Sequence, residues 1–297
     1  GIGQTINGAR LWVQIGPLGF QPAEIGKVLV VIFLASYLTQ KRELLQVATS
    51  RIGPLRLPPA KHLGPVLLAW GASLAILFLQ RDLGASLLYF GIFVVMLWVA
   101  TGRAAYLVIG LILFVAGAYI GWLLFDHVQL RVDIWLHALD PAKVFDQGFG
   151  QLAQAQFGMA SGGLVGTGLG QGSPGLIPFA STDFIFAAIG EELGLLGSTA
   201  ILLLYLLLVG KGLRVGLRAP DAFSTLLAVG LSTLVALQAF VIVGGVTRII
   251  PLTGVTLPFV SYGGSSLVSN FVLLGLLVRV SSGPLAPRER TLRGGAA

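Results

Sequence analysis

The sequence contains no cysteine and few charged residues. Without cysteine, thiol catalysis, disulfide bonds and thiolate metal sites are all excluded. The three histidines, His62, His127 and His137, are scattered along the chain and suggest no ligand cluster. Only 10% of the 297 residues are charged, whereas an average soluble domain has roughly 25%. An ordinary soluble globular protein is therefore excluded.

Long apolar stretches make up most of the chain. Hydrophobic residues account for 55% of it and the mean hydropathy is +0.89, so too few polar side chains remain to cover a water-facing surface. A helix needs about 17 to 25 apolar residues to cross a bilayer. Seven such stretches lie near residues 20–40, 62–80, 83–101, 104–125, 183–211, 222–246 and 263–283. The sequence predicts an all-α polytopic membrane protein, a single domain over 1–297 that forms a bundle of about seven transmembrane helices.

The positive charges indicate the orientation of this bundle. Of the 19 lysines and arginines, thirteen lie in alternate connections between the spans, at the span ends that adjoin these connections, or at the C-terminal end of the chain. Because positive residues are retained on the cytoplasmic side, we expect a short cytoplasmic tail, with residue 1 and the loop 126–182 outside. The net charge of +7 reflects this topology, and no nucleic-acid partner is expected. The chain begins at Gly1 within an outer loop, so we expect upstream residues to be missing.

The connection 126–182 is far longer than ordinary loops. It retains large apolar residues, among them Trp135, Phe145 and Phe157, so we predict a large folded extracytoplasmic loop at the outer mouth of the bundle. Its glycine run over 161–170 suits either a phosphate-cradling loop or tight turns with close backbone approach. No Lys-Ser/Thr pair follows the run and no predicted strand precedes it, so tight turns are favoured.

Ionisable residues inside the spans are rare and therefore informative. Glu24 and Lys27 lie three residues apart on one face of the first predicted helix, where they can form an ion pair. Such a pair is either a clasp between helices or a part of the substrate-handling machinery. Glu191 and Glu192 are expected to be hydrogen-bond partners between helices. An interfacial turn accounts for Asp82.

Ser181, Thr182 and Asp183 directly precede a long apolar run, which is the signature of a helix N-cap. Capping alone accounts for such an aspartate in most proteins. Here, however, Asp183 ends the one long outer loop, where a lipid-borne polar substrate can reach it. The segment 251–266 is rich in proline and glycine, and broken backbone at membrane depth needs protein or a watery cavity around it. We expect this segment either to line the same cavity or to be a purely structural turn.

The same residues carry a resemblance to a known family. The motifs are Asn7-Gly8-Ala9-Arg10 with Trp12, Gln21-Pro22-Ala23-Glu24-Ile25-Gly26-Lys27, Gln80-Arg81-Asp82-Leu83-Gly84, Leu139-Asp140-Pro141, Ser161-Gly162-Gly163, Thr182-Asp183-Phe184-Ile185-Phe186, Glu191-Glu192-Leu193-Gly194, and Leu257-Pro258-Phe259 through Ser266. In this order and from end to end, the chain resembles the shape, elongation, division and sporulation (SEDS) family, the RodA and FtsW polymerases. The family usually has ten spans, so the resemblance implies that the first three are missing here.

The resemblance implies a peptidoglycan glycosyltransferase of the bacterial cytoplasmic membrane. Such an enzyme polymerises lipid II into a nascent glycan strand on the outer face, releases undecaprenyl pyrophosphate, and works with a class B penicillin-binding protein in elongation or division. Asp183 matches the essential acidic residue and is expected either to act as the general base or to position the attacking hydroxyl. The Glu24–Lys27 pair is expected to line the cavity. The residues expected to bind substrate are Arg10, Arg131, Gln151, Gln154 and Ser261, with Lys143 and Arg248 in reserve.

Some residues depart from the family pattern, and a cation and other functions are also considered. A divalent cation, Mg or Mn, would suit a pyrophosphate leaving group, but the sequence shows no complete metal site. Phe179 and Ser181 stand where the family often has Glu and His, and Gly150 and Ala155 replace the Tyr and Ser that flank Gln151 and Gln154. The Ala-Ser-Thr-Asp form resembles RodA proteins of actinobacterial type. Two alternatives are a lipid II flippase and a scaffold for the class B penicillin-binding protein.

Overall fold

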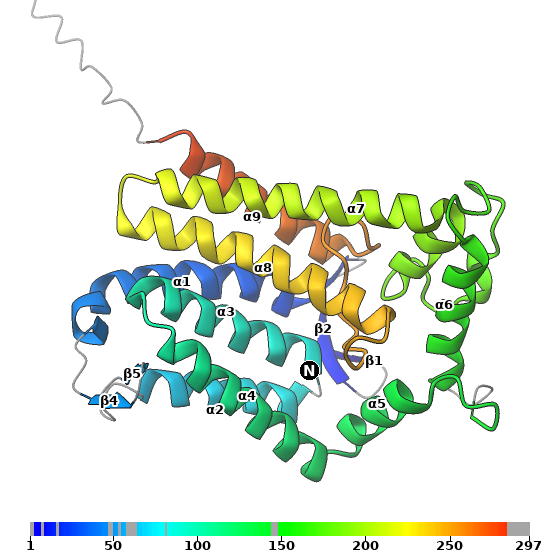
Figure 1. Ribbon diagram of the computed structural model, residues 1–297, viewed down its shortest axis with the longest axis horizontal. Coiled ribbons are helices and arrows are strands. Elements are labelled where there is room, and N and C mark those ends of the chain that lie inside the picture. Colours follow the sequence, from blue (N-terminus) through cyan, green and yellow to red (C-terminus); the bar gives the residue numbers. More distant parts are fainter. Residues whose placement is uncertain are drawn as a thin grey trace, which may run out of the picture.

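The computed structural model describes residues 3–6, 9–15, 18–46, 50–52, 55–57, 64–80, 82–143 and 148–283. Its body is a helical bundle (Figure 1). The bundle helices are α1 (Pro22–Gln46), α2 (Gly64–Gln80), α3 (Leu83–Thr101), α4 (Ala105–Leu124), α7 (Ile185–Arg218), α8 (Ala222–Val246) and α9 (Gly264–Ser281). Within the described residues, all of these except α2 are long and apolar enough to cross a membrane, and α2 is a shorter apolar helix at the place of one predicted span. The predicted all-α membrane bundle is confirmed.

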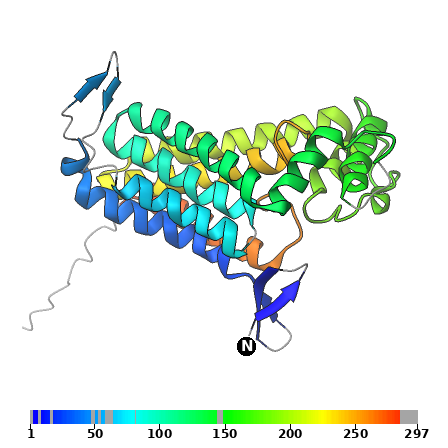
Figure 2. The ribbon, with the colours of Figure 1, turned by 90° about the horizontal axis from the view of Figure 1, so that it is seen from below.

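Short strands, which the sequence patterns did not predict, flank α1. β1 (Gly3–Ile6), β2 (Ala9–Ile15) and β3 (Leu18–Phe20) form an antiparallel sheet in that order, with Gln4 opposite Trp12. After α1, β4 (Ser50–Ile52) and β5 (Leu55–Leu57) form an antiparallel hairpin. Figure 2 shows the sheet and the hairpin at opposite ends of α1. The tail 284–297 lies outside the described residues.

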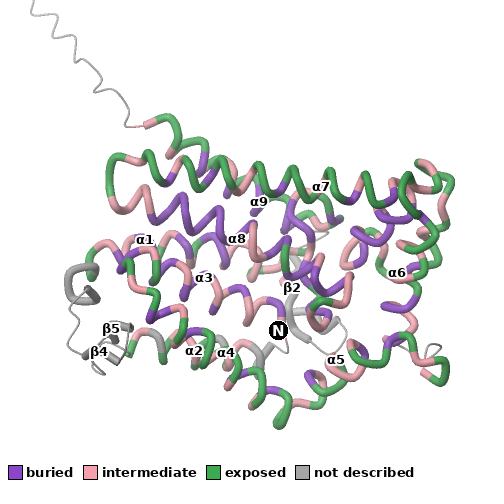
Figure 3. The backbone as a smooth tube through the Cα atoms, in the orientation of Figure 1, coloured by how far each residue is buried: buried purple, intermediate pink, exposed green. Residues whose placement is uncertain are grey.

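The central helix of the bundle is α8, which packs against α7, α3 and α1. Most of its residues are buried (Figure 3), whereas α7 exposes many leucines along its outer side. Small residues let the helices approach, as contacts inside a bilayer require. A Cβ on Gly230 of α8 would lie 2.8 Å from the sulfur of Met96, and one on Gly212 of α7 would lie 2.1 Å from the hydroxyl of Ser232.

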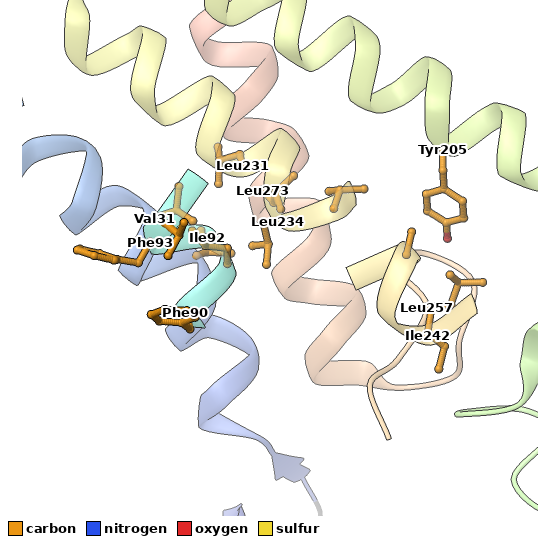
Figure 4. Close-up of a cluster of buried hydrophobic side chains, with 14 of the residues drawn as sticks. Val31, Phe90, Ile92, Phe93, Tyr205, Leu231, Leu234, Ile242, Leu257 and Leu273 are labelled. Atoms are coloured by element: carbon orange, nitrogen blue, oxygen red, sulfur yellow. The ribbon is translucent and has the colours of Figure 1, made fainter. Parts of the chain in front are cut away.

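The core is continuous across most helices of the bundle. The close-up in Figure 4 shows a cluster of fully or almost fully buried apolar side chains from α1, α3, α8 and α9. It includes Val31, Ile92, Leu231, Leu234 and Leu273. Because the surrounding lipid is as apolar as these side chains, their contribution to stability comes from close packing rather than from removal of water.

The long connection contains α5 (Asp126–His137), α6 (Phe149–Gly162) and the short 3₁₀ helix η2 (Pro174–Leu176). Helix α6 packs mainly against α7. In Figure 1 this connection lies toward the same end of the bundle as the β1–β3 sheet. The connection thus forms a helical layer at one end of the bundle, which is where the candidate site is found.

Helix α7 is interrupted at Gly194, whose φ of 64° and ψ of −165° are not helical. The interruption leaves two backbone carbonyls and two backbone N–H groups of α7 without their helical partners. The glycine-rich segment 163–168 forms a hydrogen bond with each of these four groups. These bonds run from Thr167 N–H to Glu191 O (3.0 Å), from Gly168 N–H to Glu192 O (3.0 Å), from Leu195 N–H to Gly163 O (2.9 Å) and from Leu196 N–H to Leu164 O (3.1 Å).

The close backbone approach expected of the glycine run is found at this interruption. A Cβ on Gly162 would lie 2.0 Å from the carbonyl oxygen of Gly190, and one on Gly166 would lie 2.1 Å from that of Glu192. Glu191 was expected to bond another span, but among the described residues its side chain makes no such bond. Its carboxylate instead accepts the N–H of Ser173 in the loop (2.8 Å).

Candidate functional site

Three charged side chains from distant parts of the chain interact at the end of the bundle that carries α5. Asp183 directly precedes α7, Arg131 lies on α5, and Asp82 lies immediately before α3. All three are half-buried. The charge of Arg131 acts on both carboxylates, and the charge of Asp82 acts on Asp183. The tertiary structure therefore assembles a site of one cation and two acids.

Asp183 is not the helix cap that its sequence context suggested. Helix α7 begins at Ile185 with Phe184 in the N-cap position, and no side chain caps it. Phe184 is buried in the core, which holds the chain in place just after the acid. Among the described residues, no hydrogen bond to the Asp183 carboxylate is found. The carboxylate is therefore available to a ligand, which the capping interpretation did not allow.

The surroundings of Asp183 favour its protonated form. Burial raises the pKa of the Asp183 carboxyl, the charge of Arg131 acts in the opposite direction, and Asp82 raises the pKa further. A carboxylate whose pKa is raised toward neutral pH is a better proton acceptor in its ionised form. The same surroundings favour loss of the Arg131 charge, since burial lowers the pKa of its guanidinium while both acids oppose this change. An arginine nevertheless stays protonated at any working pH.

Arg131 is close enough to interact with both acids but does not pair directly with either. Within the described part of the chain, no nitrogen of Arg131 lies within the 4.0 Å limit of an ion pair to a carboxylate oxygen. The guanidinium keeps its donors for a ligand. Planar guanidinium groups bind phosphate oxygens in a bidentate manner, so Arg131 is well suited to a pyrophosphate.

Asp82 is the site residue that sequence reasoning missed. It does cap α3 by accepting the N–H of Ala85 (2.8 Å), as an interfacial turn requires. Burial nevertheless raises the pKa of the Asp82 carboxyl, against the bonds that it accepts from Ala85 and Gly84. The sequence does contain a sign of close packing near Asp82, namely Gly84, which follows it by two residues. A Cβ on Gly84 would lie 2.1 Å from the side chain of Val255, so this glycine lets the 251–263 loop lie on the start of α3.

The 251–263 loop, which joins α8 to α9, lies against the acids of the site. A Cβ on Gly254, where φ is +75°, would lie 3.7 Å from a carboxylate oxygen of Asp183. Ser261 is buried, and its hydroxyl accepts the N–H of Leu257 (2.8 Å) and donates to the carbonyl of Thr182 (2.7 Å). The loop therefore holds the residue that precedes Asp183. A direct role of Ser261 in substrate binding stays a prediction.

The ion pair predicted on α1 is present. The Nζ atom of Lys27 lies 2.6 Å from an oxygen of Glu24, and Lys27 is only 4% exposed. Glu24 raises the pKa of the Asp82 carboxyl, so the pair lies near the site. The ammonium also donates to Oε1 of Gln238 on α8 (3.0 Å). This contact makes the pair a link between α1 and α8, and a cavity-lining role stays a prediction.

The two reserve cations are engaged elsewhere. Arg248 donates through its guanidinium to the carbonyls of Trp135 (3.0 Å) and Leu136 (3.3 Å), and the indole N–H of Trp135 donates to the Arg248 carbonyl (2.9 Å). Lys143 pairs with Asp133 at 3.0 Å. Both cations therefore hold the connection together, which leaves Arg131 as the cation of the described site.

Three other predicted residues are not placed at the site. Gln151 and Gln154 lie on α6, and no hydrogen bond in the described structure joins either of them to Asp183, Arg131 or Asp82. Arg10 lies in β2, but its side chain lies outside the described part of the structure. For these residues substrate binding stays a prediction.

An apolar groove lies along the start of α7. Its volume is about 650 Å³, and apolar side chains such as Ile177, Phe179 and Ile185 form most of its wall. Glu192 and Ser181 are its polar members, and Ser181 lies two residues before Asp183. The wall of this groove suits a hydrocarbon chain, and Asp183 itself is not among the residues that line it.

The fold and the site together define a polytopic helical membrane protein with a charged site at one end of its bundle. Residues 1–283 match the family model FTSW_RODA_SPOVE, described as cell cycle protein, so the chain belongs to this family. The chain is 47% identical over 287 residues to the peptidoglycan glycosyltransferase RodA of Mycobacterium tuberculosis. The matched region covers 96% of this chain and 61% of that protein. It is 37% identical to stage V sporulation protein E of Bacillus subtilis, with 95% and 74% covered.

Solved structures show the same fold. A structure described as "Structural coordination of polymerization and crosslinking by a peptidoglycan synthase complex" matches with a TM-score of 0.73 and 30% identity, covering 95% of this chain and 75% of that one. The rod shape determining protein RodA of Thermus thermophilus matches with a TM-score of 0.59 and 27% identity, covering 95% and 72%. The chain spans about 61% of the length of the Mycobacterium tuberculosis RodA that it matches.

Proposed function

We propose that the protein is a peptidoglycan glycosyltransferase that polymerises lipid II into glycan strands on the outer face of the bacterial cytoplasmic membrane. Its family and the names of its mycobacterial relatives support this activity. The observation that carries the proposal is the uncapped, half-buried Asp183, which lies in the field of Arg131. An apolar groove lies along the start of α7, the helix that follows this acid, with Ser181 in its wall. A lipid-linked sugar requires these three features together: an acid or base, a cation for phosphate, and a surface for the chain.

In the proposed reaction, the 4-hydroxyl of one disaccharide attacks the anomeric carbon of another. The bond from that carbon to undecaprenyl pyrophosphate breaks with inversion, and the pyrophosphate leaves as an anion. Asp183 accepts the proton of the attacking hydroxyl, a role for which its raised pKa is suited. Because the leaving group needs neutralisation rather than protonation, one carboxylate is sufficient where glycosidases use two. Arg131 supplies that neutralisation, with Arg10 as its expected partner.

A divalent cation is a second part of the proposal. The described residues contain no group of three side chains of the kind that holds a metal alone. Mg²⁺, however, is often bound by one or two carboxylates together with substrate phosphates, and Asp82 with Asp183 forms such a pair of acids. The cation would add to the neutralisation of the pyrophosphate. Loss of activity in EDTA and its recovery with Mg²⁺ or Mn²⁺ test this part.

The proposed partner is a class B penicillin-binding protein, which crosslinks the strands. The solved complex whose fold this chain shares couples polymerization and crosslinking, which supports such a partner. We further propose that residue 1 and the 126–182 connection lie outside the cytoplasm and that the C-terminus lies inside, as the distribution of positive charge indicates.

The test uses the full-length protein with its partner and lipid II. Asp183→Asn should reduce polymerisation by about 10²-fold or more, because it removes a general base. The matched control is Asp133→Asn, which makes the same change in an acid of α5 that pairs with Lys143 and His137, and it should retain activity. An unaltered rate in Asp183→Asn overturns the base assignment. Transfer of labelled lipid II across vesicles without polymer formation would favour a flippase instead.

A further inference from the structure

Gln238 is a polar residue in the middle of the most buried helix. It lies on α8 and is 0% exposed. Its Oε1 accepts a hydrogen bond from Lys27 on α1 (3.0 Å), and its Nε2 donates to the carbonyl of Thr256 in the 251–263 loop (2.9 Å). An amide can accept and donate at the same time, which a carboxylate or an ammonium cannot do. Gln238 therefore joins the ion pair to the loop through a single side chain.

The loop continues this connection to the acid. Leu257, the next residue after Thr256, donates its N–H to Ser261, and Ser261 donates to the carbonyl of Thr182. The N–H of Tyr262 donates to the carbonyl of Ser181 at 2.8 Å. Two bonds from the loop thus reach the two residues before Asp183, and Gly254 of the same loop lies beside its carboxylate.

The opposite side of the loop is anchored on α9. The hydroxyl of Thr256 lies 2.8 Å from that of Ser266, and Ser269 donates to the backbone carbonyl of Glu24. Ser266 and Ser269 are buried among apolar helices, where an unpaired polar group is costly and a complete network is rigid. Since Gln238 is the described contact that joins Lys27 to the loop, its loss should loosen the loop and leave the helices packed.

We infer that Gln238 is a positioning residue, which transmits the position of the Glu24–Lys27 pair to the 251–263 loop and so holds Asp183 opposite Arg131. The ion pair acts on the reaction through Gln238 rather than by touching substrate. The catalytic half of this inference rests on the proposed function. The mechanical half states that Gln238 anchors the loop, and it does not depend on the proposed function.

The mechanical half is tested by hydrogen–deuterium exchange of the full-length protein. In Gln238→Met, which removes both hydrogen bonds at similar volume, the amides of Leu257 and Tyr262 should exchange about 10-fold faster, because local opening becomes easier. The matched control is Ser232→Ala, since Ser232 is equally buried on α8 but bonds only its own helix, at Ala228. Unchanged exchange in Gln238→Met, or an equal increase in Ser232→Ala, overturns the inference.

The catalytic half is tested by kinetics on lipid II with the partner present. Gln238→Met should lower kcat about 10-fold with KM unchanged within about two-fold, because Gln238 touches no substrate. Lys27→Met should have a similar effect, and the double variant should be no worse than the poorer single variant. Additive losses, or faster exchange with unchanged kcat, overturn the catalytic half of the inference. If the wild type does not polymerise lipid II, the proposed function fails, and the exchange result alone decides whether Gln238 anchors the loop.

Discussion

The interruption of α7 provides the most direct test of the structure. Gly194 has backbone angles that are essentially restricted to glycine, with φ at 64° and ψ at −165°. In Gly194→Ala the new Cβ would lie 2.3 Å from the backbone nitrogen of Gly166 and 2.7 Å from the carbonyl of Leu164. Both neighbours are backbone atoms, so neither can rotate away. The glycine-rich segment must separate from α7.

The magnitude follows from strain and from the hydrogen bonds that the separation breaks. Backbone strain of this kind costs about 1–3 kcal/mol. Each net hydrogen bond contributes about 1 kcal/mol, and the bonds at Leu195 and Leu196 lie closest to the displaced segment. We therefore expect the free energy of unfolding to fall by about 3–5 kcal/mol, which corresponds to a decrease in Tm of about 10 °C.

The assay is thermal unfolding of the purified protein in detergent, read by intrinsic fluorescence. The matched control is Gly210→Ala on the same helix, where a new Cβ meets no atom within 4 Å. Because alanine favours the helix more than glycine does, the control should be neutral or more stable by about 1 kcal/mol. Equal melting temperatures for the two variants would refute the account of the interruption.

Three further predictions concern the site and its supports. In Arg131→Met the acid limb of the rate profile should move to higher pH, because Arg131 lowers the pKa of Asp183 against the effect of burial; a limb at unchanged pH in assays on lipid II would contradict this. Arg248→Met should lower the free energy of unfolding by about 1–3 kcal/mol, since two carbonyls of α5 lose a charged donor; an unchanged Tm would show that α5 does not need this contact. Asp221→Ala should cost about 1 kcal/mol by removing the N-cap of α8. Bonds from Ser224 lower the pKa of Asp221 in the folded protein, so in a series of melts the wild type should lose this advantage only as pH falls through the lowered pKa.

The sequence predicted the features that depend on local patterns. Apolar length predicted the spans, and the spacing of three residues predicted the Glu24–Lys27 pair. The absence of a Lys-Ser/Thr pair correctly favoured turns for the glycine run. Each of these predictions uses residues that lie within a few positions of one another, where helical geometry alone sets the distance.

Local context was insufficient where the partners of a residue lie far away in the chain. Asp183 has the sequence context of a helix cap, but the helix begins two residues later and leaves the carboxylate uncapped. Asp82 is a cap as its context suggested, and yet its field reaches Arg131 and Asp183. Arg248 was a candidate for the substrate, and its guanidinium instead holds the end of α5. In each case the decisive neighbour is far away in the chain.

Composition and periodicity by themselves determined that this protein is a bundle of membrane-spanning helices, and family motifs marked which acid to examine. Only the tertiary structure decided that Asp82, Arg131 and Asp183 share one site and that Gln238 joins the ion pair to the loop beside it. The physical reason is that helix length and apolarity are properties of contiguous residues. The field at a carboxylate, in contrast, depends on which helices pack together, and here this is decided by small residues such as Gly84 and Gly230, which permit close contact with partners far along the chain.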